Sequence, residues 1–484
     1  MSAIKRITVV NVILFFTLSS LVFFSCGRED FSPPLKDYTG HYQVTPNYTI
    51  TISLRAGHLY YQPTGQPDRD LLLRRSPGVY HLEEWQGNKI RFSRGENGNV
   101  DALIIEKSGG DRRCPRVLSA VQIKTVPVAD RFIPVEPVDT PKEDENPVLQ
   151  TLQSIKKNGA FYTMYYYADY SEIVKKADSW EYWQQHKNKI PDSFKCSIFY
   201  NCENPKQPLF GRNFDNIPCD LLVGFYRPKK GYASITLTRL SDLGFKTGTD
   251  ITALDVSERT GLLAAPFLVS DGMNEQGLAV GVASVNQQKV TIDKNKKNIH
   301  ISAFCRNILD FAGGVEQAIE MVRLYNIYDD KEGGYTVAHH LLVADSSGRS
   351  AILECVNGRF EAQPSKQGRE IVTNSPLINV PEPTRQEQCR RYELLSNNFN
   401  DAGKEKNWQW AMSSLRDVAY TGNPAISCWS AVYNLENKSL YIVLKLQYHR
   451  VYRLRIRRIL RRIRGQSDHD ARKLGRQNPE KSEV

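Results

Sequence analysis

Cys196 stands at the start of a strand-like run, and a cation and a carboxylate follow it at short range. The run Lys-Cys-Ser-Ile-Phe-Tyr leads into a polar turn and then into Leu-Phe-Gly-Arg-Asn-Phe-Asp, which contains Arg212 and Asp215. If the second run is a strand that returns beside the first, it brings the guanidinium and the carboxylate back to the thiol. A thiolate is a strong nucleophile, and a nearby cation favours the thiolate. The pattern therefore indicates a catalytic cysteine, because a packing cysteine needs neither neighbour.

Three further polar motifs follow Cys196 in order. They are Asp-Gly-Met-Asn-Glu with Asn274, Thr-Asn-Ser-Pro with Asn374, and Cys-Arg-Arg-Tyr with Arg391, followed later by Trp-Ser-Ala-Val-Tyr-Asn at 429–434. An Asn amide can donate to an oxyanion without adding a charge that needs neutralising. Taken alone, each Asn is typical of a turn and the Arg is typical of an exposed helix face. The hypothesis therefore depends on the ordered set.

This ordered set resembles the choloylglycine hydrolases and linear amide C–N hydrolases, N-terminal nucleophile (Ntn) hydrolases related to the penicillin acyltransferases. The resemblance covers residues 196–448 and implies an α+β fold, an αββα four-layer sandwich. It implies that Cys196 is the nucleophile and that no cofactor takes part. It also assigns the supporting roles. Arg212 would hold and acidify the thiol, Asp215 would orient an α-amine, Asn274 and Asn374 would donate to the oxyanion or the amine, and Arg391 would support the site.

Two details qualify this resemblance. The surroundings of Arg391 depart from the Ser-rich pattern of the family. Glu275, beside Asn274, is expected to brace its turn rather than to catalyse.

The base in this chemistry would be the α-amine of Cys196 itself. An α-amine has a pKa of about 7.7–8.0, near that of a free thiol at about 8.5. The histidines form no Cys-His signature, which disfavours a papain-like site. Because 195 residues precede Cys196, the bond between Lys195 and Cys196 must break first. We predict self-cleavage by the same thiol; cleavage after Lys195 by a host protease and an uncleaved chain are the alternatives.

The N-terminus resembles a bacterial lipoprotein signal. Lys5 and Arg6 precede an apolar stretch at 7–24, and Cys26 follows it. We predict a signal peptide at 1–25, a lipidated Cys26 and a tether at 26–35, which place the protein at the bacterial cell envelope, lipid-anchored on the periplasmic or surface side of the outer membrane. An uncleaved membrane anchor and an ordinary signal peptide are the alternatives.

The rest of the 484-residue chain divides by composition. Residues 36–125 alternate apolar and polar residues between turns, which predicts a small all-β barrel. They are similar to the accessory β-barrel of some secreted serine hydrolases, and no catalytic set is found in them. A Pro-rich, acidic linker is expected at 126–147, a helical pro-segment at 148–195, and the cysteine amidase domain at 196–448.

Within the amidase domain the sequence predicts alternating helices and strands. The expected helices are 304–312, 315–325 and 386–399. The expected strands are 267–270, 278–284, 340–345, 351–356 and 440–445.

The net charge of +11 is concentrated in a basic tail at 449–484, because residues 450–464 contain eight Arg and no acid. Its apolar residues at helical spacing suggest an amphipathic helix on an anionic membrane surface; the alternative is a solvated tail. Nucleic acid binding is not expected. The nine cysteines show no metal-ligand spacing, so no metal is predicted, and no disulfide pairing can be assigned.

These observations predict an exported, lipid-anchored cysteine Ntn hydrolase. Its substrate would be a small-molecule linear amide such as a conjugated bile acid or an N-acyl amino acid. One alternative is an acyltransferase of the penicillin acyltransferase type, and another is a non-catalytic binding lipoprotein on an Ntn scaffold. The oligomeric state is not predicted.

Overall fold

The computed structural model describes residues 34–76, 78–82, 89–106, 110–121, 126–135, 146–171, 195–365, 367–422 and 425–455. The predicted signal peptide with Cys26 lies outside these residues, as do 172–194 of the pro-segment and 456–484 of the tail. No helix within the described ranges combines the length and the apolar character needed to span a bilayer.

The N-terminal part is a closed barrel of eight antiparallel strands, with β1 returning to pair with β8. It confirms the small β-barrel that the sequence predicts. Tyr42, Ile50, Ile90 and Leu103 fill its centre without exposed surface. A short 3-10 helix, η1 (Leu35–Tyr38), precedes it. The strands are β1 (Gly40–Thr45), β2 (Tyr48–Arg55), β3 (His58–Pro63), β4 (Asp70–Ser76), β5 (Val79–Leu82), β6 (Lys89–Arg94), β7 (Val100–Glu106) and β8 (Arg112–Val117).

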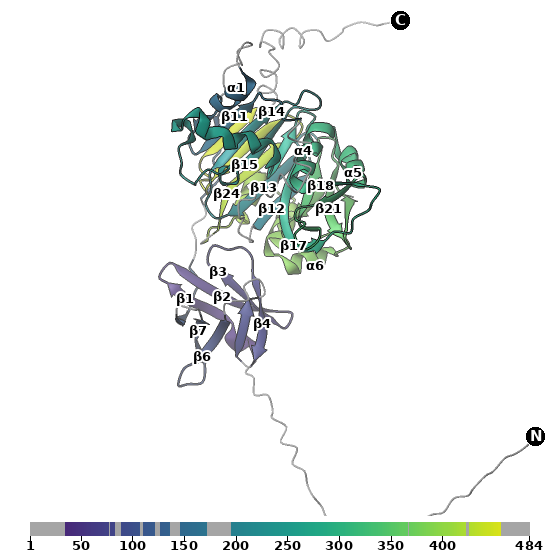
Figure 1. Ribbon diagram of the computed structural model, residues 1–484. Coiled ribbons are helices and arrows are strands. Elements are labelled where there is room, and N and C mark those ends of the chain that lie inside the picture. The colour runs from purple at the N-terminus through teal and green to yellow at the C-terminus, as the bar shows by residue number, and fades with distance from the viewer. Residues whose placement is uncertain are drawn as a thin grey trace, which may run out of the picture.

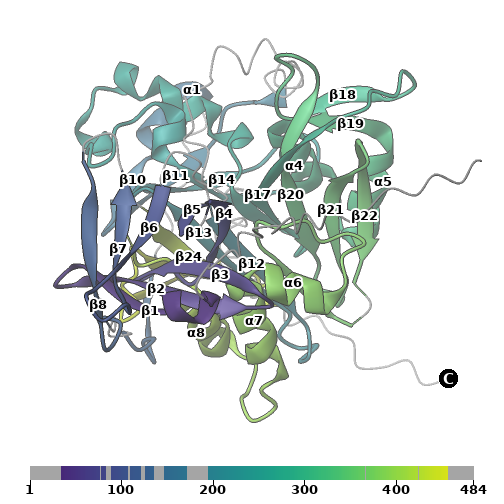
Figure 2. The same ribbon diagram turned by 90° about the horizontal axis from the view of Figure 1, so that it is seen from below.

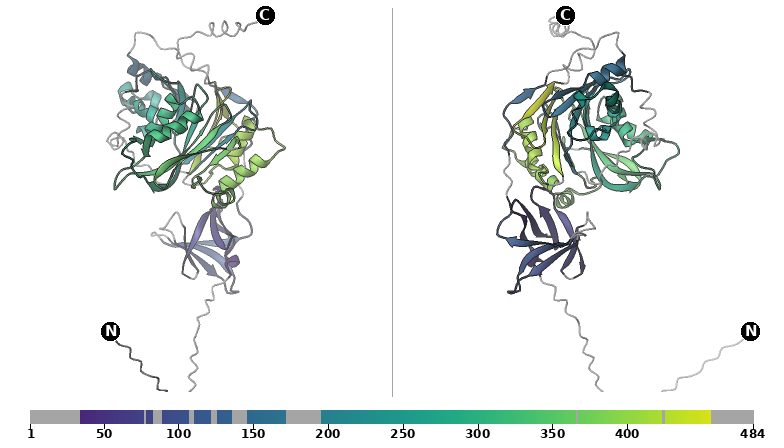
Figure 3. Two further views of the ribbon diagram at one scale, coloured as in Figure 1. Left: turned by 90° about the vertical axis from the view of Figure 1, so that its right-hand side faces the viewer. Right: turned by 60° about the vertical axis from the view of Figure 1, so that its left-hand side comes forward.

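The C-terminal part contains two stacked sheets between two helical layers, as the two side views show (Figure 3). One core lies between the sheets and extends to the helices on the smaller sheet. A second core lies between the larger sheet and its own helices. This is the α+β sandwich that the sequence predicts, and the barrel lies below it (Figure 1).

The larger sheet has nine strands in the order β10-β11-β14-β15-β16-β17-β20-β21-β22. Their bounds are β10 (Lys156–Asn158), β11 (Phe161–Tyr166), β14 (Leu221–Tyr226), β15 (Ser234–Arg239), β16 (Asp271–Asn274), β17 (Ala279–Lys289), β20 (Thr336–Ala344), β21 (Ser350–Val356) and β22 (Arg359–Pro364). The helices on this side are α1 (Pro147–Gln153), η2 (Leu240–Leu243), η3 (Ile251–Ala253), η4 (Val256–Phe267), α4 (Ile301–Phe311) and α5 (Val315–Leu324), with a small parallel pair, β18 (Lys297–His300) and β19 (Tyr325–Tyr328).

The smaller sheet has seven strands in the order β23-β12-β13-β24-β25-β26-β9. Their bounds are β23 (Arg369–Val372), β12 (Lys195–Asn201), β13 (Leu209–Asn216), β24 (Ile426–Asn434), β25 (Ser439–Leu444), β26 (Val451–Arg455) and β9 (Phe132–Pro134). Its helices are α6 (Glu382–Gln388), α7 (Arg390–Asn400) and α8 (Trp408–Asp417). Seen from below, the barrel lies over the end of the sandwich that carries α7 and α8 (Figure 2).

The predicted helical pro-segment at 148–195 is wrong for part of its described length. Residues 147–153 form the helix α1, but residues 161–166 form β11, which pairs in parallel with β14. Every residue of β11 is buried, and its aromatic run suits a strand covered on both faces. Residues 161–166 therefore form an interior strand of the larger sheet.

Four other predicted segments also differ from the structure. β9 lies inside the predicted linker at 126–147 and pairs in parallel with β26. The first residues of the predicted tail helix form the strand β26. Val451, Tyr452 and Leu454 of this strand are buried in the core between the sheets, so packing overrides the helical spacing. The expected strand at 267–270 is absent, since η4 runs to Phe267. The expected helix at 386–399 is interrupted at Cys389, whose backbone is extended.

Candidate active site

The β12–β13 pair sets the position of the nucleophile. Cys196 lies opposite Phe214 and Ile198 lies opposite Arg212, so Cys196 and Arg212 project toward the larger sheet. The Arg212 Nη2 atom donates to the Cys196 Sγ atom over 3.3 Å. Both side chains are buried, with exposed fractions of 2% and 1%. The predicted thiol–cation pair is therefore present.

A carboxylate that the sequence analysis missed holds Arg212 in place. The Arg212 Nε atom lies 3.2 Å from the Asp271 Oδ2 atom, and Nη1 donates to the Ser270 carbonyl over 2.5 Å. Asp271 in turn accepts from Tyr433 Oη at 2.5 Å and from Trp429 Nε1 at 3.3 Å. Asp271 is the first residue of the motif that contains Asn274. Side chains alternate between the two faces of a strand, and this alternation could have identified Asp271 as the residue of the motif that faces Arg212.

The Cys196 thiol is not acidified on balance in this uncleaved chain. Burial raises its pKa above the usual value and is the largest influence. Arg212 and Arg391 lower the pKa, as does a backbone hydrogen bond from Asp215, while the Asp215 charge raises it. The predicted effect of Arg212 is therefore present, but desolvation outweighs it.

Asp215 is fully buried on β13, opposite Lys195. One carboxyl oxygen accepts a hydrogen bond from Ser427, and the other, Oδ2, has no hydrogen-bond partner. Burial raises the pKa of Asp215 to about 7, with Asp68 adding to the rise and Arg391, Arg212 and Ser427 opposing it. This unpaired buried oxygen lies on the strand residue opposite Lys195 and can accept a further N–H donor.

Asn374 connects the two sheets at the nucleophile. It follows β23, and its Oδ1 atom accepts from the Cys196 backbone nitrogen over 2.7 Å. Its Nδ2 atom donates to the Ser284 carbonyl on β17 over 2.8 Å. Of the two roles that the resemblance implies, this geometry favours holding the nitrogen of Cys196 over donating to an oxyanion.

A buried His–Glu pair organises the loop that carries Asn374. His340 contacts Glu354 Oε1 at 2.9 Å and the Thr373 carbonyl at 2.6 Å. Glu354 also accepts from the backbone nitrogens of Leu377 and Ile378. Burial raises the pKa of Glu354, but His340 and these backbone donors hold it below the usual value. Neither residue stood out in the sequence.

Arg391 lies on the opposite side of Cys196 from Arg212 and is 1% exposed. Its Nη1 atom donates to the Cys196 carbonyl and to Ser197 Oγ, the latter over 3.0 Å. Its Nη2 atom donates to Asn374 Oδ1 over 2.7 Å. Arg391 therefore lies where the prediction places a residue that supports the site. It is buried, unlike the Arg of an exposed helix face.

Asn274 does not reach the site, contrary to the prediction. Its Nδ2 atom donates to the carbonyls of Leu309 and Ala312 at the end of α4, and its Oδ1 atom accepts from the backbone of Gln276 and Leu278. These bonds occupy its side chain on the helix-covered face of the larger sheet. Successive side chains of a strand point to opposite faces, so Asp271 faces Arg212 while Asn274, three residues later, faces α4.

The neighbouring acid behaves as expected. Glu275 braces the turn, since its Oε1 atom accepts from the Ala233 backbone nitrogen over 3.0 Å.

The barrel contributes Asp68, although no site residue was expected there. Asp68 lies between β3 and β4, and its Oδ2 atom is 2.7 Å from Arg391 Nε and 2.5 Å from Tyr420 Oη. The Cys389 thiol also donates toward its Oδ1 atom at 3.6 Å. No local pattern could have revealed this residue, because its partners lie more than 300 residues away.

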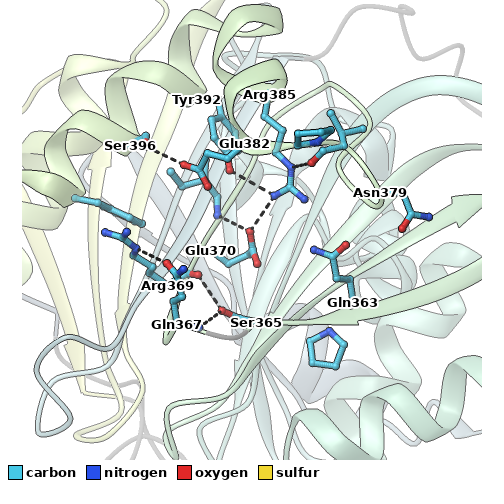
Figure 4. Close-up of a pocket in the computed structure, with 15 residues that line it drawn as sticks. Gln363, Ser365, Gln367, Arg369, Glu370, Asn379, Glu382, Arg385, Tyr392 and Ser396 are labelled. Atoms are coloured by element: carbon cyan, nitrogen blue, oxygen red, sulfur yellow. Dashed lines mark hydrogen bonds and ion pairs between the residues drawn. The ribbon is translucent and has the colours of Figure 1, made fainter.

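A polar cavity of about 550 Å³ lies beside β23, between β22, α6 and α7 (Figure 4). Glu370 and Arg385 face each other there at 3.6 Å, and Glu382 accepts from Ser396 over 3.1 Å. Burial raises the pKa of Glu370 to about 7, opposed by Arg385. None of the predicted catalytic residues lines this cavity.

Neither metal ligation nor disulfide bonding is found in the described part of the chain. No group of three His, Cys, Asp or Glu side chains there could hold a metal ion. The eight described cysteines are all free thiols.

Residues 196–407 match the family model of the linear amide C–N hydrolases, choloylglycine hydrolase family. This match confirms the resemblance that the sequence motifs indicate. The chain is also 32% identical to a penicillin V acylase of Pectobacterium atrosepticum over 117 residues. That match spans 23% of this chain and 31% of the relative, so it covers less than a third of the relative's length.

Two solved structures are similar over about half of the chain. A variant of the conjugated bile acid hydrolase from Clostridium perfringens aligns with a TM-score of 0.42 at 15% identity, covering 54% of this chain and 93% of that one. The penicillin V acylase from Agrobacterium tumefaciens aligns with a TM-score of 0.37 at 18% identity, covering 54% and 86%.

Proposed function

We propose that this protein is a cysteine Ntn amidase that hydrolyses a linear, non-peptide amide through an acyl-thioester on Cys196. The observation that carries the proposal is the buried cluster around Cys196. Arg212 contacts its thiol, Asn374 its backbone nitrogen and Arg391 its carbonyl, with Asp215 opposite the preceding residue. The family of residues 196–407 supports the same chemistry.

Activation would begin at the bond between Lys195 and Cys196. The Cys196 sulfur attacks the Lys195 carbonyl carbon, the C–N bond breaks, and the released nitrogen takes the thiol proton. The resulting thioester is hydrolysed by water, which frees the thiol and leaves a carboxylate on Lys195. The new α-ammonium of Cys196 then meets Asn374 Oδ1 and the unpaired Oδ2 atom of Asp215, which both accept N–H donors.

Turnover would use the same groups. The α-amine takes the thiol proton, and the sulfur attacks the substrate carbonyl. The substrate C–N bond breaks as the leaving amine takes the proton from the α-ammonium, which leaves an acyl-thioester. Water, deprotonated by the α-amine, then attacks the thioester, and the C–S bond breaks to release the acid and the thiol. A carboxylate at Asp215 stabilises the ammonium state that occurs in both halves of this cycle.

The cleaved fragments would remain together. β11 belongs to the fragment before Cys196, yet it is an interior strand of the larger sheet with all residues buried. β9 pairs in the same way with β26 in the smaller sheet. Separating the fragments would expose these strands, so the barrel stays attached to the catalytic part. With a lipidated Cys26, the whole complex would remain at the cell envelope.

The substrate class would be a small amide with an acyl group and an amine-bearing leaving group. The relatives are named for penicillin V and for conjugated bile acids, and we propose these two classes and N-acyl amino acids as a first panel. Added amine acceptors in the same assay would reveal acyl transfer in place of hydrolysis.

Intact mass and thiol labelling test this proposal. Wild-type protein should give two fragments that divide between Lys195 and Cys196 and co-purify, while Cys196→Ala should remain one chain. An electrophilic thiol probe should label Cys196 in the wild type. The Cys202→Ala variant is the control and should be labelled at Cys196 to the same extent, since Cys202 has no place in the site. A single wild-type chain with an unlabelled Cys196 and no hydrolysis of the panel would contradict the proposal.

A further inference from the structure

The loop at residues 64–69 of the barrel is built into the amidase site. The Gly65 carbonyl accepts from the Thr421 backbone nitrogen over 2.7 Å and from its hydroxyl over 2.9 Å. Asp68, three residues on, keeps only 11% of its side chain exposed. It accepts from Tyr420 and from Arg391. Tyr420 and Thr421, in the segment before β24, therefore hold the loop. This places the Asp68 carboxylate against the buried Arg391 guanidinium.

Asp68 supplies the negative charge that pairs with Arg391. The other Arg391 donors go to the Cys196 carbonyl, Ser197 and Asn374, all of them neutral acceptors. Within the described ranges, Asp68 is the one carboxylate in an ion pair with Arg391. A buried guanidinium that loses such a partner is strongly destabilised.

We propose that Asp68 is a positioning residue of the amidase site, so that the barrel completes the catalytic centre and is more than a spacer. Asp68 holds Arg391 against the Cys196 carbonyl and Asn374. This inference rests on the proposed amidase function.

Asp215 is the competing partner that makes this positioning necessary. Its Oδ2 atom has no hydrogen-bond partner, and its charge interacts with that of Arg391. Without Asp68, Arg391 would turn toward Asp215. Cys196 would then lose a donor to its carbonyl, and the α-amine would lose the carboxylate that should orient it. Burial raises the pKa of Asp68, but Arg391, Lys195 and Tyr420 lower it below its usual value, so it is charged when it holds Arg391.

The test compares Asp68→Asn and Asp68→Glu with Arg55→Gln in the full chain. Arg55 forms the exposed contact between the barrel and Glu393 at 3.7 Å and touches no site residue, so it is the matched control. With any panel substrate that the wild type hydrolyses, Asp68→Asn should lower kcat about 10- to 100-fold, as a misplaced site group does, with little change in KM. Asp68→Glu should recover part of kcat, and Arg55→Gln should match the wild type. An unchanged or raised kcat in Asp68→Asn would overturn the proposal and make the loop a removable cover.

A second readout needs no substrate. The pH midpoint of Cys196 alkylation by iodoacetamide, followed by peptide mass, should rise in Asp68→Asn because Arg391 no longer lowers the thiol pKa. An unchanged or lowered midpoint overturns the proposal, since Arg391 would then have stayed in place. If the wild type hydrolyses no panel substrate, the proposed function fails and this midpoint alone decides the role of Asp68.

A third variant guards against misfolding. If Asp68→Asn unfolds at a lower temperature than Arg55→Gln, Tyr420→Phe removes one donor to Asp68 while keeping its charge. It should lower kcat about 3- to 10-fold, the effect of one hydrogen bond, and an unchanged kcat would overturn the proposal.

Discussion

Two buried arginines flank Cys196, and they are held in different ways. Arg212 faces the thiol and pairs with Asp271, a residue of the same sandwich. Arg391 faces the Cys196 carbonyl and pairs with Asp68, a residue of the barrel. The thiol side of the site is thus complete within the amidase fold. The backbone side includes a residue of a second domain. In the proposed function, processing and domain contact therefore both act on that side.

Replacing Arg212 should have the largest effect. Arg212→Met removes the donor to the thiol and leaves Asp271 buried without its cation, so activity should fall about 1,000-fold and the free energy of unfolding by about 3–5 kcal/mol. Substrate turnover and urea unfolding measure the two. The double variant Arg212→Met/Asp271→Leu should recover stability but not activity. Recovery of activity as well would mean that the pair is structural.

Replacing Arg391 should cost less stability than replacing Arg212. In Arg391→Met the orphaned Asp68 is already 11% exposed and lies on a surface loop of the barrel, so water can reach it. Activity should fall about 100-fold, whereas unfolding free energy should fall by about 1–3 kcal/mol. Arg391→Lys should not restore activity, because an ammonium cannot serve Asp68, Cys196 and Asn374 together. Equal stability losses at the two arginines would remove the contrast between the two sides.

Asp215 should make the uncleaved chain less stable as the pH rises. Its folded pKa is about 7, above the unfolded value of about 3.9. Below the unfolded value both states are protonated and there is no effect. Between the two values the unfolded chain releases a proton that the folded chain keeps, so stability falls with pH, by on the order of 3–4 kcal/mol in total.

The comparison of Cys196→Ala with Cys196→Ala/Asp215→Asn, both uncleaved, measures this effect. The Asn variant should unfold at the higher temperature at pH 8 and at a similar temperature at pH 4. Lower stability of the Asn variant at both pH values would show that Asp215 is already paired before cleavage.

Asn274 should affect stability and leave the chemistry nearly unchanged. Asn274→Ala removes bonds to α4 and to its own turn and should cost about 2–3 kcal/mol of unfolding free energy. The activity of the folded fraction should remain within about threefold of the wild type, because the side chain does not reach Cys196. A large loss of kcat with normal thermal unfolding would return Asn274 to the catalytic set.

Much of the thiol side could be predicted from the sequence. Cys196, Arg212 and Asp215 lie on two consecutive antiparallel strands, so their approach follows from local pairing and alternation. Asn374 could be predicted only through its family motif, because its loop is positioned by His340 and Glu354 from other strands. Asn274 was misassigned since its motif is shared but its strand parity directs it to α4. The sequence predicts a helix where β11 lies because the partner strand that makes it part of a sheet, β14, comes later in the chain.

The sequence by itself determined the candidate nucleophile, its cation and the class of fold, since these depend on residues that are neighbours along the chain or on adjacent strands. Only the tertiary structure decided which acids hold the two arginines. Asp271 reaches Arg212 because the two sheets stack, and Asp68 reaches Arg391 because the barrel lies against the end of the sandwich. A buried guanidinium requires an anion, but chain order does not say which of many acids will be near it once the layers have packed.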